Sequence, residues 1–282
     1  MKQLTFLSDF GLKDSYVAEV KGVLAAAVPE ARVIDITHQI EHANLRAASF
    51  VLSISFGYFS SSSLHLAVVD PGVGSERDVL IVYTHHYVFI GPDNGLLYQA
   101  ARNDGIHRIY AVDAQRLYRR LAEAFAGNEV VERIVRQGPS CTFHGRDLFA
   151  PAAGYILGGF GPEEIAGEKQ DMVMLEIPSP VRSRQKLFGK VIYIDRFGNL
   201  ITNVPAGMVD PRAEIYLKTG TRVQGAGKLK QTYSQVREGW ALALIGSRGY
   251  LEIAVNGASA REHFGADYGD DILILTHSEE GV

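Results

Sequence analysis

The sequence predicts an α/β protein: an N-terminal domain with a mostly parallel sheet covered by helices on both faces, then a small C-terminal β-barrel domain. Three observations lead to this interpretation. The chain has 282 residues, which exceeds the usual size of a single hydrophobic core. Strand-like and helix-like segments alternate over its first two thirds. Beyond residue 188 the segments are short and β-rich, with turn residues at close intervals.

The elements of the N-terminal domain follow from hydrophobic periodicity and from the residues that interrupt it. Residues 3–7 are apolar and β-prone, and a helix is expected over residues 14–28, where Asp14 can cap the start and Pro29 stops the end. Further strands are expected at residues 32–36, 64–69, 80–83, 87–90 and 109–112. Further helices are expected at residues 44–59, 94–102 and 146–157. Together these elements define a domain at residues 1–160.

A change in composition separates this domain from the rest of the chain. Residues 161–188 contain Pro162, Pro178 and Pro180 among many charges, as expected of a linker. The strands expected beyond it lie at residues 189–194, 200–204, 213–217, 240–245, 251–255 and 271–276. We therefore expect a β-barrel domain at residues 189–282.

Composition and charge exclude several classes of protein. Hydrophobic residues make up 46% and charged residues 21% of the chain, which is ordinary for a soluble globular protein. The net charge of -4 and the shortness of the basic runs argue against a nucleic-acid partner. Neither a signal peptide nor a bilayer-spanning apolar stretch is evident, so we expect no membrane partner and a cytoplasmic location. The single cysteine, Cys141, excludes an internal disulfide and a multi-cysteine metal site.

One pattern recurs along the chain: an apolar strand that ends on an acid and a glycine. It occurs as SDFG (8–11), DPGVG (70–74), GPDNG (91–95), HGRD (144–147) and IDRFGN (194–199). Open α/β sheets usually bind small molecules at such strand ends. Several of these ends converging would form one pocket rich in carboxylates and exposed backbone amides.

The segment VVDPGVGSER at residues 68–77 is the most informative of these. Pro71, Gly72 and Gly74 force a turn directly after the buried strand expected at residues 64–69. The turn places Asp70 and Arg77 at the mouth of that strand, and the two can meet only if the loop folds back. Such a pair either binds a ligand or stabilises the loop as a structural ion pair, and the residues alone leave both interpretations open.

A metal site is the main alternative use of these acids. No motif has the GxxxxGK[ST] pattern of a phosphate-binding loop or the GxGxxG pattern of a dinucleotide-binding turn. The strand-end acids could instead hold Mg²⁺ for phosphoester chemistry, because hard cations prefer oxygen ligands.

Five motifs in order resemble those of the S-adenosyl-L-methionine hydroxide adenosyltransferase family. These are SDFG with Asp14 and Lys21-Gly22, VVDPGVGSER, GPDNG, TFHGRD with FAPAA, and IDRFGN with Thr202-Asn203. The family is related to the fluorinating and chlorinating enzymes that act on the same substrate, and the match runs from about Leu4 to Asn256. It implies an α/β domain, a β-barrel domain, and homotrimers with active sites at subunit interfaces.

The resemblance implies hydrolysis of S-adenosyl-L-methionine to adenosine and methionine, with water as nucleophile at ribose C5′ and no metal or cofactor. The sulfonium makes methionine a neutral thioether leaving group, so the enzyme chiefly needs a positioned water. The Asp, Arg and His triad of the family falls on Asp70, Arg77 and His144. Arg77 would hold the water and stabilise developing hydroxide. Asp70 and His144 would orient the water, and either could accept its proton.

The same resemblance implies residues that bind the nucleoside. Asp9 would grip the two ribose hydroxyls, although a carboxylate in this turn could equally cap a helix or shape the turn. Phe197 would stack on the adenine, with packing in the barrel core as the alternative. The backbone near Val255 and Asn256 would meet the edge of the adenine. A lone histidine such as His144 is also often structural rather than catalytic.

Four further residues are implied at the methionine end. Asp195 and Asn199 would face it, and Asp195 could pair with the α-ammonium group. Ser247 and Arg248, in the segment GSRGYL, would face the carboxylate.

Two departures from the halogenating relatives favour water as the nucleophile. The loop at residues 37–44 lacks the tryptophan with which those enzymes cover the substrate, and Ala43 stands at about that place. Gly145 stands where they have a halide-binding serine. A non-catalytic sensor that binds adenosine or S-adenosyl-L-methionine in the same pocket is an alternative function.

Overall fold

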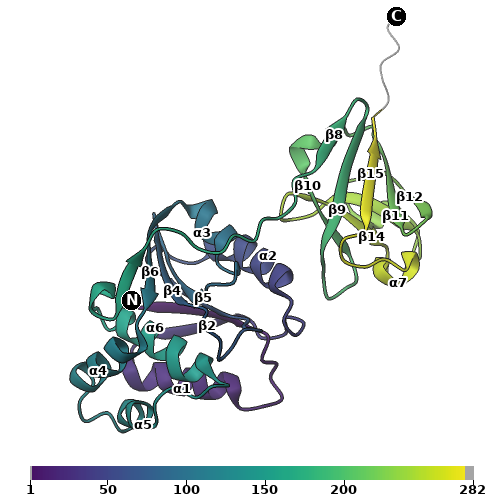
Figure 1. Ribbon diagram of the computed structural model, residues 1–282. Helices are drawn as coiled ribbons and strands as arrows, with labels where there is room; N and C mark the ends of the chain where they lie inside the picture. The colour runs from purple at the N-terminus through teal and green to yellow at the C-terminus, as the bar shows by residue number, and fades with distance from the viewer. Residues whose placement is uncertain (1, 277–282) are drawn as a thin grey trace, which may run out of the picture. The chain divides into compact units, whose positions relative to one another are not determined.

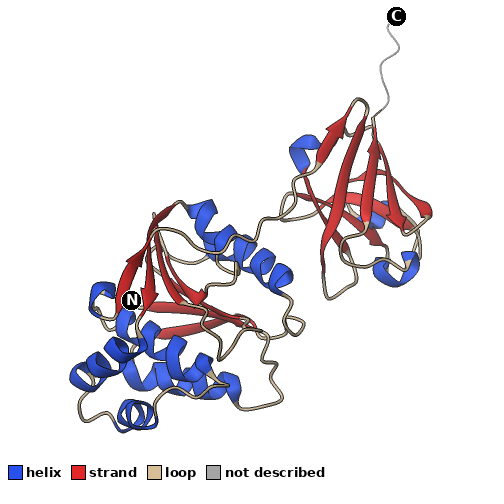
Figure 2. Ribbon diagram, in the orientation of Figure 1, coloured by secondary structure: helices blue, strands red, loops and turns tan. Residues whose placement is uncertain are grey.

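The computed structural model describes residues 2–276, and the chain divides into two compact units between Glu176 and Ile177. Figures 1 and 2 show that the first unit layers helices around a sheet, whereas the second is built almost entirely of strands. This arrangement confirms the predicted fold class. Within the described residues, no helix combines the length and the apolar character needed to cross a membrane.

The first unit contains a seven-stranded sheet in the order β2-β1-β3-β5-β4-β6-β7. Its strands are β1 (Gln3–Ser8), β2 (Arg32–Thr37), β3 (Leu64–Val68), β4 (Val79–Thr84), β5 (Val88–Pro92), β6 (Ile106–Val112) and β7 (Ala166–Lys169). The pairs β1–β2, β1–β3 and β3–β5 are parallel, and the pairs that involve β4 or β6 are antiparallel. Of these seven strands, therefore, all but β4 and β7 run in the same direction.

Helices cover both faces of this sheet, because its central strands are apolar on both sides. The helices are α1 (Tyr16–Ala27), α2 (Leu45–Ser55), α3 (Tyr98–Asp104), α4 (Ala114–Ala124), α5 (Glu129–Gln137) and α6 (Ala150–Leu157). Helices α1, α4, α5 and α6 share one hydrophobic core with Phe6 and Leu66. Helices α2 and α3 share the other core with Leu7 and Ala67. Neighbouring strand residues thus point to opposite faces, as strand geometry requires.

The second unit is a closed barrel. Its strands are β8 (Val181–Ser183), β9 (Lys186–Ile194), β10 (Leu200–Pro205), β11 (Glu214–Thr219), β12 (Arg222–Lys230), β13 (Ala241–Ile245), β14 (Tyr250–Val255) and β15 (Asp271–Leu275). They pair in the order β10-β14-β13-β12-β11-β15-β9-β8, and an additional pairing of β9 with β10 closes the ring. Helix α7 (Ala260–Phe264) contributes Phe264 to the barrel core.

Several elements differ from the sequence-based expectations. Helices α4 and α5 were not predicted, because many of their residues are charged and few apolar positions remain to show a helical period. Strand β12 was also missed, since its glycines weaken the β pattern. The predicted linker at 161–188 contains two strands: β7 pairs with β6 and β8 pairs with β9. Helix α3 begins at Tyr98 rather than at the predicted Asn94.

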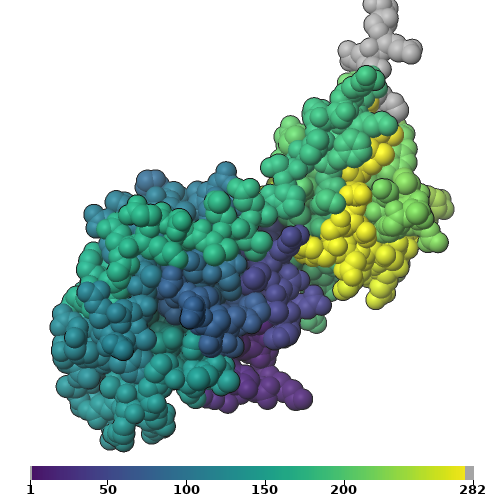
Figure 3. Space-filling view, in the orientation of Figure 1, coloured from purple at the N-terminus to yellow at the C-terminus, as the bar shows by residue number. Residues whose placement is uncertain are grey.

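In Figure 3 the surface of the first unit is formed by chain segments of widely separated residue number, purple beside teal and green. Residues far apart in the sequence therefore share one surface. The chain reversal that matters most for function occurs after β3, where the segment DPGVG meets the segment that precedes α6.

Candidate active site

The turn after β3 folds back on itself, as its glycines predicted. Val73 N donates to Asp70 O at 3.2 Å, and Ser75 N donates to Gly72 O at 3.0 Å. Gly74 has φ +81°, and a Cβ atom there would lie 2.5 Å from the carbonyl oxygen of Cys141. Only glycine fits this conformation and this contact without displacing the backbone. The turn therefore packs directly against the segment that carries His144.

Asp70 and Arg77 form the ion pair that the loop geometry allowed. Arg77 Nε lies 2.9 Å from Asp70 Oδ1 and 3.0 Å from Oδ2, and Nη2 also donates to Oδ2. The two side chains are only 7% and 11% exposed, so solvent screens the pair weakly. The guanidinium also lies over the ring of Phe149, with 5.1 Å between its central carbon and the ring centroid.

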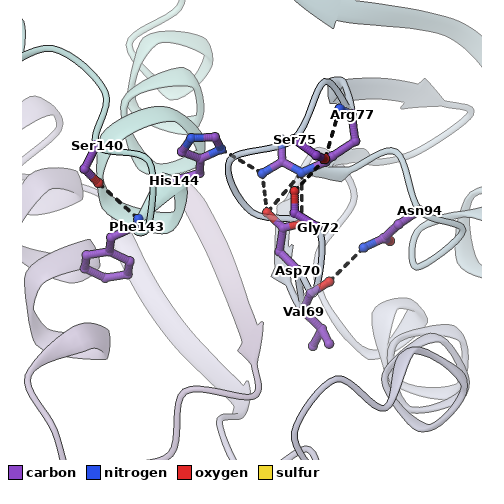
Figure 4. Close-up of polar contacts among 9 residues, drawn as sticks. All are labelled: Val69, Asp70, Gly72, Ser75, Arg77, Asn94, Ser140, Phe143 and His144. Atoms are coloured by element: carbon purple, nitrogen blue, oxygen red, sulfur yellow. Dashed lines mark hydrogen bonds and ion pairs between the residues drawn. The ribbon is translucent and has the colours of Figure 1, made fainter.

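His144 joins this pair from a different part of the chain, as Figure 4 shows. It precedes the short π-helix η2 (Gly145–Phe149), and its Nδ1 lies 2.9 Å from Arg77 Nη2. Arginine can only donate, so Nδ1 accepts and the neutral ring carries its proton on Nε2. Burial, and then the positive charge of Arg77, hold the pKa of His144 below its ordinary value. The structure thus brings the three predicted catalytic residues together.

A pocket of about 370 Å³ opens beside this cluster, a size that suits a small molecule. Its polar lining includes Asp70 and His144 with Asp9, His42 and Thr142, and its apolar lining is Phe10, Tyr16, Val68, Val73, Phe143 and Gly145. Arg77 is not among the lining residues. It is bonded to both Asp70 and His144 and so connects them.

Asp9 enters this pocket from the turn that follows β1. Its Oδ2 accepts a hydrogen bond from Ala43 N at 3.0 Å and lies 3.5 Å from His42 Nδ1. The side chain is 9% exposed. Helix α1 begins later, at Tyr16, with Ser15 at the capping position. Asp9 is therefore not a helix cap, and neither is Asp14.

The other acids at strand ends of the first unit are each paired with a cation outside the pocket. Asp93 Oδ2 lies 2.6 Å from Lys169 Nζ, and Asp147 Oδ1 lies 2.7 Å from Arg146 Nε. Within residues 2–276, no group of three or more His, Cys, Asp or Glu side chains is arranged to hold a metal ion. The expected convergence is therefore partial: three of the motifs line the pocket, and Asn94 of GPDNG supports it by donating to Val69 O at 2.9 Å.

The second unit has a pocket of its own, of about 560 Å³. Its lining includes four of the predicted residues, Phe197, Asn199, Val255 and Asn256, together with Tyr233 and the segment Gly257–Ser259. Phe197 is 74% exposed, so the alternative that it packs in the barrel core is wrong. Tyr233 was missed because no motif surrounds it in the sequence.

The remaining predicted residues of the second unit lie outside this lining. Asp195 shapes its own turn: Oδ1 accepts from the amides of Phe197 and Asn199, both at 2.9 Å, and Oδ2 accepts from Asn199 Nδ2 at 2.9 Å. Ser247 and Arg248 are exposed at the tip of the β13–β14 hairpin. Val255 lies at the opposite end of that hairpin, paired with Ala241.

Comparison with known families gives a match to each unit. The N-terminal domain of the SAM hydroxide adenosyltransferases matches residues 4–166, and the C-terminal domain of the same family matches residues 189–273. The chain belongs to the SAM hydroxide adenosyltransferase family. The resemblance inferred from the five motifs is thereby confirmed.

Related proteins cover nearly the whole of this adenosyltransferase-family chain. A protein of Thermus thermophilus named (R)-S-adenosyl-L-methionine hydrolase is 36% identical over 98% of this chain and 100% of its own length. A fluorinase of Nocardia brasiliensis is 24% identical, with 91% of each chain covered. A crystal structure of an uncharacterized conserved protein from Thermotoga maritima has a TM-score of 0.84 at 33% identity, over 97% of this chain and 100% of that one.

Proposed function

We propose that this protein hydrolyses S-adenosyl-L-methionine to adenosine and L-methionine. The observation that carries the proposal is the Asp70–Arg77–His144 cluster, which lies against a pocket that also contains Asp9. Membership of the SAM hydroxide adenosyltransferase family supports it, as does the name (R)-S-adenosyl-L-methionine hydrolase given to relatives of 30–36% identity.

The reaction is a displacement at carbon. A water oxygen forms a bond to ribose C5′ while the C5′–S bond breaks. The electron pair of the C5′–S bond moves to the sulfonium sulfur. Methionine leaves as a neutral thioether, so no acid is needed to protonate it. The water loses one proton, and the products are adenosine, methionine and H⁺. The protein therefore has two tasks: to position the water and to receive its proton.

We assign these two tasks to different members of the cluster. In the neutral tautomer described above, His144 carries an Nε2–H donor, and we propose that this donor holds the water oxygen in exchange for the hydrogen bond of the ring with the backbone of Ser140. Asp70 is then the group that accepts the proton, which the water releases readily because it becomes strongly acidic as its bond to C5′ forms. Arg77 fixes the position of the Asp70 carboxylate and the tautomer of His144, in place of the direct contact with water that was expected of it.

We propose that substrate binding is divided between the two units in the way predicted from the sequence. Asp9 would bind the ribose hydroxyls in the first unit. In the second, Phe197 would stack on adenine, and Asn256 and the backbone near Val255 would bind its edge. Asn199 would lie beside them, although it was expected at the methionine end.

Asp195 is proposed to contact the α-ammonium of methionine, and Ser247 and Arg248 are proposed to contact its carboxylate.

We further propose that catalysis needs no metal or cofactor, that the chain acts in the cytoplasm, and that it forms homotrimers with active sites at subunit interfaces. Light scattering would measure the mass of the assembly: a monomer or dimer would contradict the trimer.

The decisive experiment is incubation of the pure protein with S-adenosyl-L-methionine in ¹⁸O-labelled water, followed by chromatography and mass spectrometry. Equal amounts of methionine and of adenosine labelled at its 5′ oxygen are expected, with and without added halide. The two sulfonium epimers should be supplied separately, because the names of the relatives specify the R form. Tight binding without any product would instead support the sensor, and a 5′-halogenated adenosine would overturn the choice of nucleophile.

A further inference from the structure

His38 follows β2 and is hydrogen-bonded to both ends of the SDFG turn. Its imidazole Nδ1 lies 2.7 Å from Ser8 Oγ, and its carbonyl oxygen accepts a hydrogen bond from Gly11 N at 2.7 Å. Asp9 and Phe10 lie between these two attachment points. Ser8 and His38 are 0% and 3% exposed, so neither can move without disturbing packed neighbours.

His38 is itself held on its other side. Its Nε2 lies 3.1 Å from Asp35 Oδ1, and Asp35 Oδ2 is 2.6 Å from Lys21 Nζ. The geometry at Nε2 is outside that of an ordinary hydrogen bond, but a lone pair there would face the negative carboxylate, so Nε2 carries the proton and Nδ1 accepts the hydroxyl proton of Ser8. Burial lowers the pKa of His38, which keeps the ring neutral at pH 7. The chain Lys21–Asp35–His38–Ser8 therefore runs from α1 to the residue beside Asp9.

The same loop also fixes one oxygen of Asp9 and leaves the other to a ligand. Ala43 has a left-handed φ of 60°, and in this conformation its N–H donates to Asp9 Oδ2 at 3.0 Å. Among the described residues, none donates a hydrogen bond to Asp9 Oδ1. Because Asp9 lines the pocket, this oxygen is available to a hydroxyl group there.

We infer that His38 is a positioning residue for nucleoside recognition, acting through Ser8 and the SDFG turn to hold Asp9 in place for the ribose hydroxyls. The inference rests on the proposed function, in which Asp9 binds ribose. It predicts that loss of the His38–Ser8 bond weakens binding only of ligands that carry these hydroxyls. A merely structural role would weaken the binding of all nucleosides alike.

The chain contains a matched control for this bond. On the same strand, β1, Thr5 Oγ1 lies 2.7 Å from the Nδ1 of a second buried histidine, His65. Both Thr5 and His65 are 0% exposed, and neither lines the pocket. Thr5→Val and Ser8→Ala therefore each remove one buried hydroxyl that bonds an imidazole, and only the second lies beside Asp9.

The experiment is calorimetric titration of the full chain with adenosine and with 2′,3′-dideoxyadenosine. Ser8→Ala and His38→Leu should each weaken adenosine binding about tenfold, the cost of one misplaced hydrogen-bonded group. Neither should change the affinity for dideoxyadenosine. His38→Asn, which keeps an acceptor near the position of Nδ1, should restore most of the adenosine affinity. Thr5→Val should leave both affinities unchanged.

Three results would overturn the inference: equal weakening for both nucleosides, weakening by Thr5→Val as large as by Ser8→Ala, or no weakening by Ser8→Ala and His38→Leu. A wild-type protein that does not distinguish the two nucleosides would also overturn it. The test does not depend on turnover. A wild-type protein that binds adenosine but releases no products would contradict the proposed hydrolysis alone.

Discussion

The two pockets differ in how their polar groups are used. In the first unit, Asp70, Arg77 and His144 are half-buried and bonded to one another, so each fixes the orientation of the next. In the second unit, the Asp195 carboxylate accepts hydrogen bonds from its own turn, and the pocket is lined by the exposed ring of Phe197. Electrostatic preorganisation therefore lies in the α/β unit, and a surface suited to stacking lies in the barrel.

The two units should therefore respond differently to mutation. Changes to Asp70, Arg77 and His144 at the first pocket should act on kcat, because they alter groups at the reacting atoms. Changes in the second should act on KM, because stacking holds substrate and transition state equally. Kinetic measurements on variants of each unit would separate effects on kcat from effects on KM.

The largest effect is expected from Asp70→Asn, which keeps the shape of the side chain but removes its charge and its capacity to accept the proton. We expect kcat to fall about 10³-fold, measured as adenosine formed under saturating substrate. The control is Asp78→Asn, which removes an acid next to Arg77 that pairs with Lys169 at 2.7 Å instead. The control should keep kcat within about threefold. Comparable losses in both variants would contradict the assignment of proton acceptor.

Acidification should unfold the first unit before the second. Burial lowers the pKa of His65 to about 4 and holds those of His38 and His144 below their ordinary values. The unfolded chain takes up these protons first, so the stabilisation is complete above pH 6.5 and is lost as the pH falls toward 4. For His65 alone this amounts to about 3 kcal/mol. In the second unit, burial raises the pKa of Glu252, which acts in the opposite direction.

The chain provides a probe for each unit. Its single tryptophan, Trp240, lies in the second unit, whereas the helices α1–α6 lie in the first. In an acid titration, the helical circular dichroism signal should therefore change at higher pH than the fluorescence of Trp240. Coincident transitions would show that the two units unfold together and would contradict the prediction.

A smaller effect is expected from Phe197→Ala. Loss of one stacked ring should raise KM for S-adenosyl-L-methionine about tenfold and change kcat by less than about twofold. Phe188→Ala is the matched control, since Phe188 is another exposed phenylalanine of the barrel, on β9, and does not line the pocket. Steady-state kinetics would separate the two parameters. A drop in kcat with constant KM would place Phe197 near the reacting atoms instead.

The sequence allowed the first pocket to be anticipated better than the second. The glycines of DPGVG require a turn, and that turn makes the Asp70–Arg77 pair possible, so local chemistry was informative. The contact of Arg77 with His144 joins residues 67 positions apart, and only the resemblance to a family suggested it. The bond between Ser8 and His38 could not be foreseen, because neither periodicity nor turn chemistry specifies which buried hydroxyl meets which imidazole.

In the second unit, local signals were ambiguous for a physical reason. An Asp followed by a glycine-containing turn satisfies the hydrogen bonds of that turn first, as Asp195 does. The sequence pattern does not distinguish this use from ligand binding. Tyr233 had no signal at all, since its place in the pocket depends on how the segment between β12 and β13 covers the barrel.

The last prediction is the absence of an effect: excess EDTA should leave turnover unchanged. Three acids of the first unit that could hold a divalent cation are already paired with cationic side chains, Asp93 with Lys169, Asp147 with Arg146, and Asp70 with Arg77. At any of these three, a metal ion would have to displace a Lys or Arg side chain, which costs the ion pair as well as the hydration of the ion. Within residues 2–276, Asp9 has no such Lys or Arg partner, but it belongs to no group of three or more His, Cys, Asp or Glu side chains that could hold a metal ion. The same assay of adenosine release measures this. Activity that is lost on chelation and restored by Mg²⁺ would contradict this prediction and would support the alternative in which these carboxylates hold Mg²⁺.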